Sequence, residues 1–345
     1  MSAVSSPTSC QVVIAIPTLN EAETIEAVLR KLSLERQDVP GLELVVADGG
    51  SLDSTISIVE RVSAEFPFVH IIQNPKRIQS AAINTVARAW AGNASVLVRC
   101  DAHSVYPEKY VARLLETLHQ TEADSVVVPM DSVGRTCVQR AVAWVSDTPV
   151  GSGGSSHRGG TRSGFVDHGH HAAFQLRSFL AVGGYDETFT HNEDAELDCR
   201  LNAMGGKVYL DADIRIQYYP RENFRDLWRQ YFNYGRGRSR TLRRHPGTLR
   251  IRQIAVPAHF VLSLLSIGVA IGFGSWLPTA WPLSYLTVLA VASLALLAKH
   301  RSICALFAGP AAFVMHSAWA SGFFYGLWSV REAKWKSHKQ LLPFH

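Results

Sequence analysis

The first 130 residues alternate between short apolar runs and stretches in which apolar side chains recur at helical spacing. The apolar runs, each typical of a buried strand, lie at residues 12–16, 42–47, 69–73, 95–100 and 125–128. The segments between them that show the spacing of one helix face are residues 20–35, 54–65, 80–90 and 107–120. Alternation of this kind is typical of βαβ units in a largely parallel sheet with helices on both faces. The pattern therefore predicts an α/β fold.

The helix boundaries and the chain after Met130 are less regular. Asn20 followed by Glu23 predicts a capping box at the start of the first helix. Residues 150–164 are rich in Gly and Ser, which indicates either a disordered loop or a functional one that could close over a ligand. Beyond this loop we expect a strand at residues 165–174, a helix at 194–204, and short strands at 208–210 and 214–218.

The last third of the chain has a different, continuously apolar pattern. Between residues 253 and 330 the charged side chains are those of Lys299 and Arg301 alone. Segments 254–273, 283–298 and 302–330 approach or exceed the length that crosses a bilayer, although Gly309-Pro310 interrupts the last of them. The pattern predicts two or three membrane helices.

Charge adds a separate feature just before these apolar segments. The net charge is +5, and residues 225–252 hold nine arginines against one acid, Asp226. Aromatic side chains are interleaved, as in helices that lie at a membrane surface. A nucleic-acid partner or an unpartnered basic face are the alternatives, but the position beside apolar spans favours anionic lipid headgroups. We divide the chain into a flexible tail (1–10), an α/β catalytic domain (11–224), a basic amphipathic interface segment (225–252), membrane helices (253–330) and a basic tail (331–345).

The cysteines and the N-terminal sequence indicate the compartment in which the protein resides. Five cysteines are scattered along the chain without metal-site spacing, and the N-terminus carries no secretory signal. We therefore expect reduced thiols in a protein that faces the cytosol.

Acidic residues follow several of the predicted strands, where ligands bind in α/β sheets. Asp48 precedes two glycines, and Asp101-Ala102-His103 follows the fourth strand, so that Asp101 and His103 can face one point. An oxygen and an imidazole suit a divalent cation, although a plain surface loop is the alternative. Glu193 and Asp194 begin a helix, as caps or as a general base. His168, His170 and His171 form a cluster that could bind metal, contact substrate or serve neither role.

Two common nucleotide-binding motifs are absent from the sequence, which argues against two classes of protein. No G-x-G-x-x-G occurs at the first turn, which argues against a dinucleotide oxidoreductase. No Walker lysine motif is present, which argues against a P-loop ATPase.

The motifs in their order resemble one family. They are P-T-L-N-E (17–21), D-G-G-S-x-D-x-T (48–55), N-P-x-R with A-A-x-N (74–84), D-A-H-x-x-Y-P (101–107), G-G-Y-D-E (183–187) and N-E-D-x-E-L-x-x-R-L (192–201). This set resembles the inverting family-2 glycosyltransferases with the GT-A fold, a Rossmann-like mixed sheet with flanking helices. The basic segment and apolar C-terminus resemble the membrane-bound members that extend lipid-linked sugars, most of all the succinoglycan-type exopolysaccharide β-glucosyltransferases.

The resemblance implies roles for individual residues. Asp194 matches the catalytic base, with Glu193 beside it, and Asp101 with His103 occupies the D-x-D site that holds Mg²⁺ or Mn²⁺. The residues implied in nucleotide-sugar binding are Pro17, Thr18, Glu21, Asp48, Asp53, Arg77 and Asp101. Two departures stand out. His103 replaces the second acid of D-x-D, and the processive Q-x-x-R-W motif is only partly echoed at residues 230–234.

The resemblance also implies a function and a location. It implies transfer of a single sugar, glucose from UDP-glucose, onto a polyprenyl-diphosphate-linked saccharide with a β linkage. The catalytic domain would lie on the cytoplasmic face of a bacterial inner membrane, in contact with membrane lipids and with other exopolysaccharide assembly proteins, and without a nucleic-acid partner. A polyprenyl-phosphate sugar transferase and a non-catalytic membrane scaffold on a degenerate transferase fold remain as alternatives. Three full crossings would place the basic tail outside, against the positive-inside rule.

Overall fold

The computed structural model describes residues 12–153 and 161–335. The chain forms two compact units. Unit 1 comprises Met1–Met130 with Gly160–Gln217, and unit 2 comprises Asp131–Gly159 with Tyr218–His345. From the sequence we placed residues 131–153 in the catalytic domain, and in the structure they group with the C-terminal helices in unit 2. The predicted flexible tail at 1–10 lies outside the described residues.

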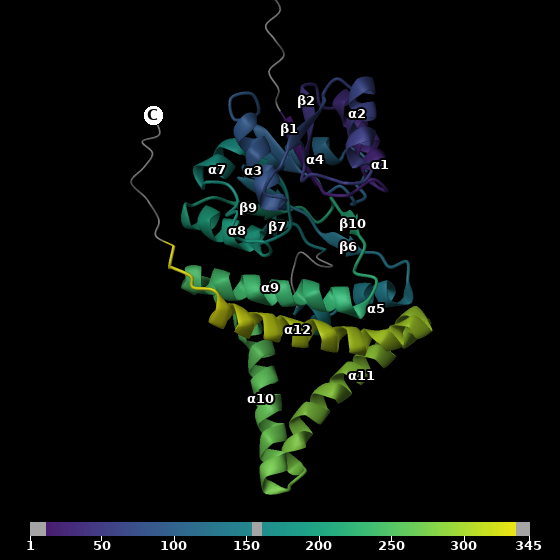
Figure 1. The fold of residues 1–345 in the computed structure, drawn as a ribbon, viewed down its shortest axis with the longest axis vertical. Coiled ribbons are helices and arrows are strands. Elements are labelled where there is room, and N and C mark those ends of the chain that lie inside the picture. Colours follow the sequence, from purple (N-terminus) through teal and green to yellow (C-terminus); the bar gives the residue numbers. More distant parts are fainter. Residues whose placement is uncertain (1–11, 154–160, 336–345) are drawn as a thin grey trace, which may run out of the picture. The chain divides into compact units, whose positions relative to one another are not determined.

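Unit 1 contains the strands that Figure 1 labels β1, β2, β7 and β9. They belong to an eight-stranded mixed sheet with the strand order β3-β2-β1-β4-β8-β5-β9-β7. Strands β3, β2, β1 and β4 are parallel, whereas β8 runs antiparallel to both of its neighbours. The strands are β1 (Val12–Thr18), β2 (Leu42–Asp48), β3 (Val69–Gln73), β4 (Val96–Arg99), β5 (Ser125–Val127), β7 (Gly164–Phe165), β8 (His171–Gln175) and β9 (Val208–Leu210). A second sheet pairs β6 (Met130–Ser132) with β10 (Ile216–Tyr218).

Helices cover both faces of this sheet. They are α1 (Ile25–Ser33), η1 (Leu34–Gln37), α2 (Thr55–Glu65), α3 (Gln79–Ala89), α4 (Tyr110–Thr121), α7 (Leu176–Ala181) and α8 (Glu193–Ala203). Alternate residues of β1 point to opposite faces, so that Ile14 packs in a core with α1, α2 and α4 while Val13 packs in a second core with α3 and α7. The predicted α/β sheet with two covered faces is confirmed.

Three local predictions differ from the structure. Helix α1 begins after Thr24, and Asn20 is not its cap because its backbone has a left-handed φ of 57° and its side chain accepts from Leu52 N. The strand expected at residues 165–174 is two strands, β7 and β8, of which β8 begins at His171. The Gly/Ser loop starts with a short helix, α6 (Pro149–Ser152), and its residues 154–160 lie outside the described part of the chain.

Unit 2 is helical. It contains α5 (Cys137–Ser146), α6, α9 (Phe224–Arg244), η2 (Pro246–Thr248), α10 (Ile251–Phe273), η3 (Leu277–Thr279), α11 (Ala280–His300), η4 (Ile303–Phe307) and α12 (Ala308–Ser329). Three stretches are long and apolar enough to cross a membrane, namely Gln253–Phe273, Leu277–His300 and Ile303–Ser329. Gly309 and Pro310 do not break the last helix but form its first turn, where proline is tolerated.

One cysteine expectation is wrong. Cys137 of α5 and Cys304 of η4 form a disulfide, with their Cα atoms 4.8 Å apart. The 167 residues between them hide this pairing in the sequence, and only the packing of α5 against η4 brings the sulfurs together. Cys100 and Cys199 take no part in a disulfide.

Candidate active site

The loops that follow the four parallel strands carry most of the predicted site residues. Because parallel strands end at the same edge of a sheet, the segments after β1, β2, β3 and β4 lie close together. Hydrogen bonds between these segments confirm that they meet: Thr18 contacts Asp48, Glu21 N donates to Thr55 Oγ1, and Glu21 contacts His103. All of these residues belong to unit 1.

Asp48 ends β2 and is buried in a ring of donors. Its Oδ2 accepts hydrogen bonds from Gly50 N at 2.7 Å and Ser51 N at 2.9 Å. Its Oδ1 accepts from Ser51 Oγ at 2.5 Å and from Thr18 Oγ1 at 3.4 Å. Gly50 supports this turn with a φ of 80°, which side-chain-bearing residues rarely adopt. The carboxylate is therefore fixed in place, and the long bond from Thr18 is its weakest one.

Asp53 and Arg77 lie beside this turn with different partners. The carboxylate of Asp53 accepts from Ala22 N, Thr55 N and Thr55 Oγ1, which ties the loop after β1 to the start of α2. These bonds, led by the one from Thr55 Oγ1, lower the pKa of Asp53. Arg77 has a left-handed φ of 56° and directs its guanidinium to Gly50 O at 3.5 Å. Arg77 thus reaches the Asp48 turn, whereas Asp53 fastens two loops.

Asp101 follows β4 and is held from several directions. Its Oδ1 accepts from Gln79 Nε2 at 2.7 Å and lies 3.7 Å from Arg99 Nε. Its Oδ2 lies 4.0 Å from His170 Nε2. Burial favours the neutral acid, but the charge of Arg99 and the nearby histidines outweigh it and lower the pKa of Asp101. The structure therefore keeps an ionised carboxylate at this strand end.

His103 is half exposed and turns its Nδ1 toward Glu21 Oε1, 3.0 Å away. The sequence does not predict this pairing of two site residues. Among residues 12–153 and 161–335, no group of three or more His, Cys, Asp or Glu side chains is arranged to hold a metal ion. Asp101 and His103 offer an oxygen and an imidazole nitrogen, ligand types that suit a divalent cation.

Asp194, in the first turn of α8, is paired with a buried arginine. Its Oδ1 lies 2.6 Å from Arg99 Nη1 and accepts from the hydroxyl of Tyr185 at 2.9 Å. Burial would raise the pKa of Asp194, yet Arg99 and the neighbouring histidines hold it well below its usual range. Arg99 itself is only 6% exposed and reaches both Asp101 and Asp194.

Glu193 has the opposite electrostatic environment. Burial, followed by the negative charge of Asp194, raises the pKa of Glu193 to about 7. Two adjacent carboxyl groups whose pKa values are pushed apart are typical of sites that move protons. The pair can hold one fixed negative charge and one proton that exchanges near neutral pH.

Two of the clustered histidines face the carboxylate of Asp198 on α8. His168 Nδ1 and His171 Nε2 lie 2.8 and 3.0 Å from its two oxygens. Burial lowers the pKa of His171, but the charge of Asp198 outweighs it and the pKa is raised. His170 faces Asp101 instead, and burial with the charge of Arg99 lowers the pKa of His170 to about 4. Two of the three histidines, His168 and His171, therefore pair with Asp198, whereas His170 faces Asp101 as a neutral imidazole near pH 7.

Sequence reasoning missed Arg99 and Tyr185. The signal for Arg99 was present, because a charged residue in the buried run Val-Leu-Val-Arg-Cys needs an acidic partner. Its partners, Asp101 and Asp194, are 2 and 95 residues away, and only the second contact depends on the tertiary fold.

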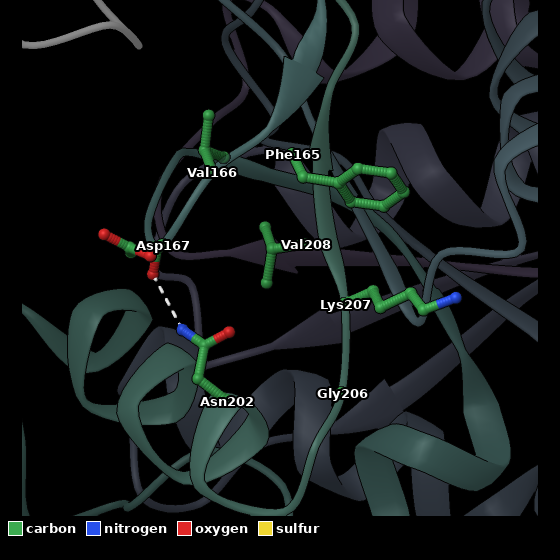
Figure 2. Close-up of a pocket in the computed structure, with 7 residues that line it drawn as sticks. All are labelled: Phe165, Val166, Asp167, Asn202, Gly206, Lys207 and Val208. Atoms are coloured by element: carbon green, nitrogen blue, oxygen red, sulfur yellow. Dashed lines mark hydrogen bonds between the residues drawn. The ribbon is translucent and has the colours of Figure 1, made fainter.

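A separate surface pocket of about 360 Å³ lies on the far part of the sheet. Figure 2 shows that it is lined by residues of β7, β9 and the end of α8, with Asn202 donating to the carbonyl of Asp167. Its only charged side chains are Asp167 and Lys207. It lacks the clustered carboxylates that make the Asp101–Asp194 region a candidate active site.

Comparison with known proteins identifies the family to which the chain belongs. Residues 13–180 match the family described as Glycosyl transferase family 2. The chain is 40% identical over 330 residues to the succinoglycan biosynthesis protein ExoA of Rhizobium meliloti (strain 1021), which covers 94% of this chain and 97% of that protein. It is 24% identical over 325 residues to a dolichyl N-acetyl-α-D-glucosaminyl phosphate 3-β-D-2,3-diacetamido-2,3-dideoxy-β-D-glucuronosyltransferase of Methanococcus voltae, covering 91% of this chain and 96% of that protein.

The fold has a counterpart among solved structures. The mannosyltransferase PcManGT from Pyrobaculum calidifontis, in complex with GDP-Man and Mn²⁺, superposes with a TM-score of 0.58 at 19% identity, over 93% of this chain and 88% of that one. The mixed sheet of unit 1 is thus a GT-A fold, as the motifs suggested. With these matches and its ordered set of motifs, the chain belongs to glycosyl transferase family 2.

Proposed function

We propose that this glycosyltransferase moves one sugar from a nucleotide sugar, UDP-glucose, onto a polyprenyl-diphosphate-linked saccharide in bacterial exopolysaccharide biosynthesis, with inversion to a β linkage. The observation that carries the proposal is the Arg99 bridge between Asp101 and Asp194. In this proposal the bridge joins two carboxylates in one buried network: Asp101, which would hold a metal ion on the donor diphosphate, and Asp194, which would accept the proton of the acceptor hydroxyl.

The donor site is proposed at the ends of β1, β2 and β4. The Asp48 carboxylate, with Thr18 beside it, would accept a hydrogen bond from the uracil ring where the bond from Thr18 Oγ1 is weakest. The guanidinium of Arg77, next to Gly50, supplies a donor for the nucleotide. Pro17, Glu21 and Asp53 shape the loop around this turn, with Asp53 acting through its bonds to Ala22 and Thr55.

A divalent metal would be held by Asp101 and His103. When bound, such an ion neutralises charge on the departing diphosphate. The pairing of an oxygen ligand with an imidazole suits Mn²⁺ better than Mg²⁺, which prefers oxygen ligands alone. The solved structure with the related fold contains Mn²⁺ and GDP-Man, which supports a metal-assisted nucleotide-sugar reaction.

Asp194 is proposed as the base. As the acceptor oxygen attacks the anomeric carbon from the face opposite the diphosphate, its bond to carbon forms, the bond from carbon to the diphosphate oxygen breaks, and its proton passes to Asp194. The attacking hydroxyl becomes strongly acidic as the new bond forms, so a carboxylate of lowered pKa is sufficient. Arg99 and Tyr185 orient this carboxylate and keep it ionised.

The proposed acceptor and location rest on the relatives and on unit 2. Both curated relatives carry names that refer to saccharide assembly, and one name specifies a sugar linked to dolichyl through a phosphate, dolichyl N-acetyl-α-D-glucosaminyl phosphate, as the acceptor. Three apolar helices follow the catalytic unit. We place the protein in the bacterial inner membrane, with unit 1 on the cytoplasmic face beside other exopolysaccharide assembly proteins. The Cys137–Cys304 disulfide opposes this placement, because disulfides persist mainly in oxidising compartments.

The test is Asp194→Asn in the full-length protein in membranes, assayed with UDP-glucose and a lipid-linked acceptor. Transfer should fall by about 10²- to 10⁴-fold, the usual contribution of a general base, with the dissociation constant of UDP-glucose unchanged. An active variant would favour a polyprenyl-phosphate acceptor, whose anion needs no base. If the unaltered protein neither transfers nor hydrolyses any of a panel of nucleotide sugars, it acts as a scaffold and the proposal is wrong.

A further inference from the structure

Helices α9 and α12 of unit 2 lie side by side along their lengths (Figure 1). Glycines make the approach possible. A Cβ atom on Gly235 would lie 2.0 Å from Trp319 O, and one on Gly322 would lie 1.9 Å from Phe232 O. Phe224 packs near Phe307 where both helices begin. The two helices are therefore parallel and adjacent along their whole length. In a membrane, each part of α12 would lie at the same depth as the part of α9 beside it.

The far end of the pair is fastened by arginines of α9. Arg243 donates to the carbonyls of Gly326, at 2.8 Å, and of Val330. Arg240 Nε lies 2.7 Å from a carboxylate oxygen of Glu332, whose side chain is only 8% exposed. The Arg243 bonds satisfy the carbonyl of Gly326 in the last turn of α12 and that of Val330 just beyond it, where helix ends leave carbonyls without partners. The C-terminal end of α12 is thus anchored beside the most basic part of α9.

Helix α9 cannot lie in the hydrocarbon core of a bilayer. It carries seven arginines and one acid, at positions 225, 229, 236, 238, 240, 243 and 244 for arginine and 226 for aspartate. Charged side chains at membrane depth are costly and rare. At the surface, the same arginines can bind anionic headgroups. Because α12 is paired with α9 from end to end, α12 also belongs at the surface.

Burial separates α12 from the other two apolar helices. Half of its most apolar stretch is buried within the protein, against 6% for α10 and 17% for α11. A polar contact supports this difference, since the imidazole of His316 lies 2.8 Å from Val150 O and 2.9 Å from the hydroxyl of Tyr285. Outward-facing aromatics such as Tyr325 and Trp328 are of the kind enriched at membrane interfaces.

Helices α10 and α11 form a hairpin with the opposite properties (Figure 1). With 23 and 21 residues they are about 34 and 31 Å long, enough to cross a bilayer core. Their turn, residues 274–279, carries no charge. Arg250 lies directly before α10, and Lys299 and Arg301 lie at the C-terminal end of α11. Basic residues at the open end and none at the turn follow the positive-inside rule.

We infer that the α10–α11 hairpin is the membrane-crossing part of the described chain, and that α9 and α12 together lie in the headgroup region on the side of the catalytic unit, with the arginines of α9 on anionic lipid headgroups. The described part of the chain then crosses the membrane twice. Its basic end, including Arg331 and Lys334, returns to the same side as unit 1. This inference concerns topology and stands whether or not the proposed reaction is correct.

Reporter fusions to the full chain test the topology. A green fluorescent protein fused after Leu342 should fluoresce and an alkaline phosphatase there should be inactive. The same two reporters inserted in the 274–279 turn should give the reverse result. An active phosphatase after Leu342 would show that α12 crosses, and an inactive one in the turn would show that the hairpin does not; either result overturns the inference.

Spin labels attached to genetically encoded unnatural amino acids test separately how deep α12 lies in the membrane. We would label the exposed positions Phe313 and Leu327 of α12, in vesicles that contain phosphatidylglycerol, and use Val261 and Ile271 of α10 as matched controls. The two α12 labels should report equal, shallow depths, while the two α10 labels should differ. Unequal depths on α12 would mean that it crosses. Gly322→Leu should unpair α12 from α9 and make its labels diverge, whereas Gly268→Leu, where a Cβ meets nothing within 4 Å, should not.

Discussion

At the scale of single residues, Arg99 connects the two halves of the proposed chemistry. Its guanidinium lies 2.6 Å from Asp194 and 3.7 Å from Asp101, and it is almost fully buried. A buried arginine without acidic partners would be strongly destabilising, so this residue and its carboxylates fix one another. Asp194 stays ionised as a result, and the neighbouring Glu193 retains its proton up to about pH 7.

The two carboxyl groups predict different pH profiles. If Asp194 is the base, kcat should stay flat below neutral pH, because its pKa lies well below the usual range and it remains ionised. Glu193→Gln should then keep kcat within about tenfold of the parent, less than the 10² typical of losing a base. The measurement is kcat against pH from 5 to 9 for both proteins. A fall in kcat below about pH 7 that Glu193→Gln abolishes, together with a large loss of rate, would move the base to Glu193.

His103 predicts a metal-dependent change in donor binding. With His103→Ala, the dissociation constant of UDP-glucose should rise by about tenfold or more in the presence of Mn²⁺, in keeping with the loss of one ligand group. With chelator present, the two proteins should bind the donor equally. Isothermal titration calorimetry with and without Mn²⁺ measures both. Equal affinities under both conditions would show that His103 is not a ligand, and that its bond to Glu21 only shapes the loop.

At the scale of elements, the loops after β1 and β2 are fastened by side chains of the ordered motifs, one of which, Asp53, the resemblance assigns to nucleotide-sugar binding. The Asp53 carboxylate bonds Ala22 N, Thr55 N and Thr55 Oγ1. Asn20 accepts from Leu52 N and its own N–H donates to Ser51 Oγ. The motif residues thus bond to one another across 31 to 32 residues of sequence. These bonds fix the loops after β1 and β2, and the fixed loops hold Thr18 and Asp48 in place.

Asp53→Asn should therefore lower the stability of these loops more than it weakens binding of the donor. Removing the charge weakens the bonds to Ala22 and Thr55, so the thermal midpoint should fall by a few degrees while the affinity for UDP-glucose stays near that of the parent. Asp38→Asn, which alters an exposed acid 4.0 Å from Lys109, is the matched control and should leave the midpoint unchanged. Weaker donor binding with an unchanged midpoint would restore a direct ligand role for Asp53.

At the scale of the whole molecule, the disulfide and the topology address the same question of location. Cys137 and Cys304 join α5 to η4, next to the start of α12. The positive charges at Arg250, Lys299 and Arg301 favour the cytoplasm for this region, whereas a disulfide favours an oxidising compartment.

Alkylation under denaturing conditions measures the thiols directly. In the unreduced protein, Cys10, Cys100 and Cys199 should be alkylated, while Cys137 and Cys304 should react only after reduction, as mass spectrometry of the peptides will show. Alkylation of all five without reduction would mean that no disulfide forms. Protection of the pair in living cells, before lysis, would count against a cytoplasmic location for α5 and η4.

The sequence by itself determined the features that depend on local pattern. Apolar runs and helical spacing predicted the covered α/β sheet, since each strand and helix must bury the face that its own residues define. The ordered motifs predicted the GT-A family, and apolar length predicted the membrane helices. These features depend on neighbouring residues along the chain, so a single sequence records them.

The tertiary structure decided what depends on residues far apart. The pairing of Arg99 with Asp194, of Asp198 with two histidines, and of Cys137 with Cys304 joins positions 27 to 167 residues apart. Likewise, α12 has the composition of a membrane span, and only its glycine contacts with the arginine-rich α9 support our inference that it lies at the surface. Hydropathy measures how apolar a helix is, whereas its depth is set by the neighbour against which it packs.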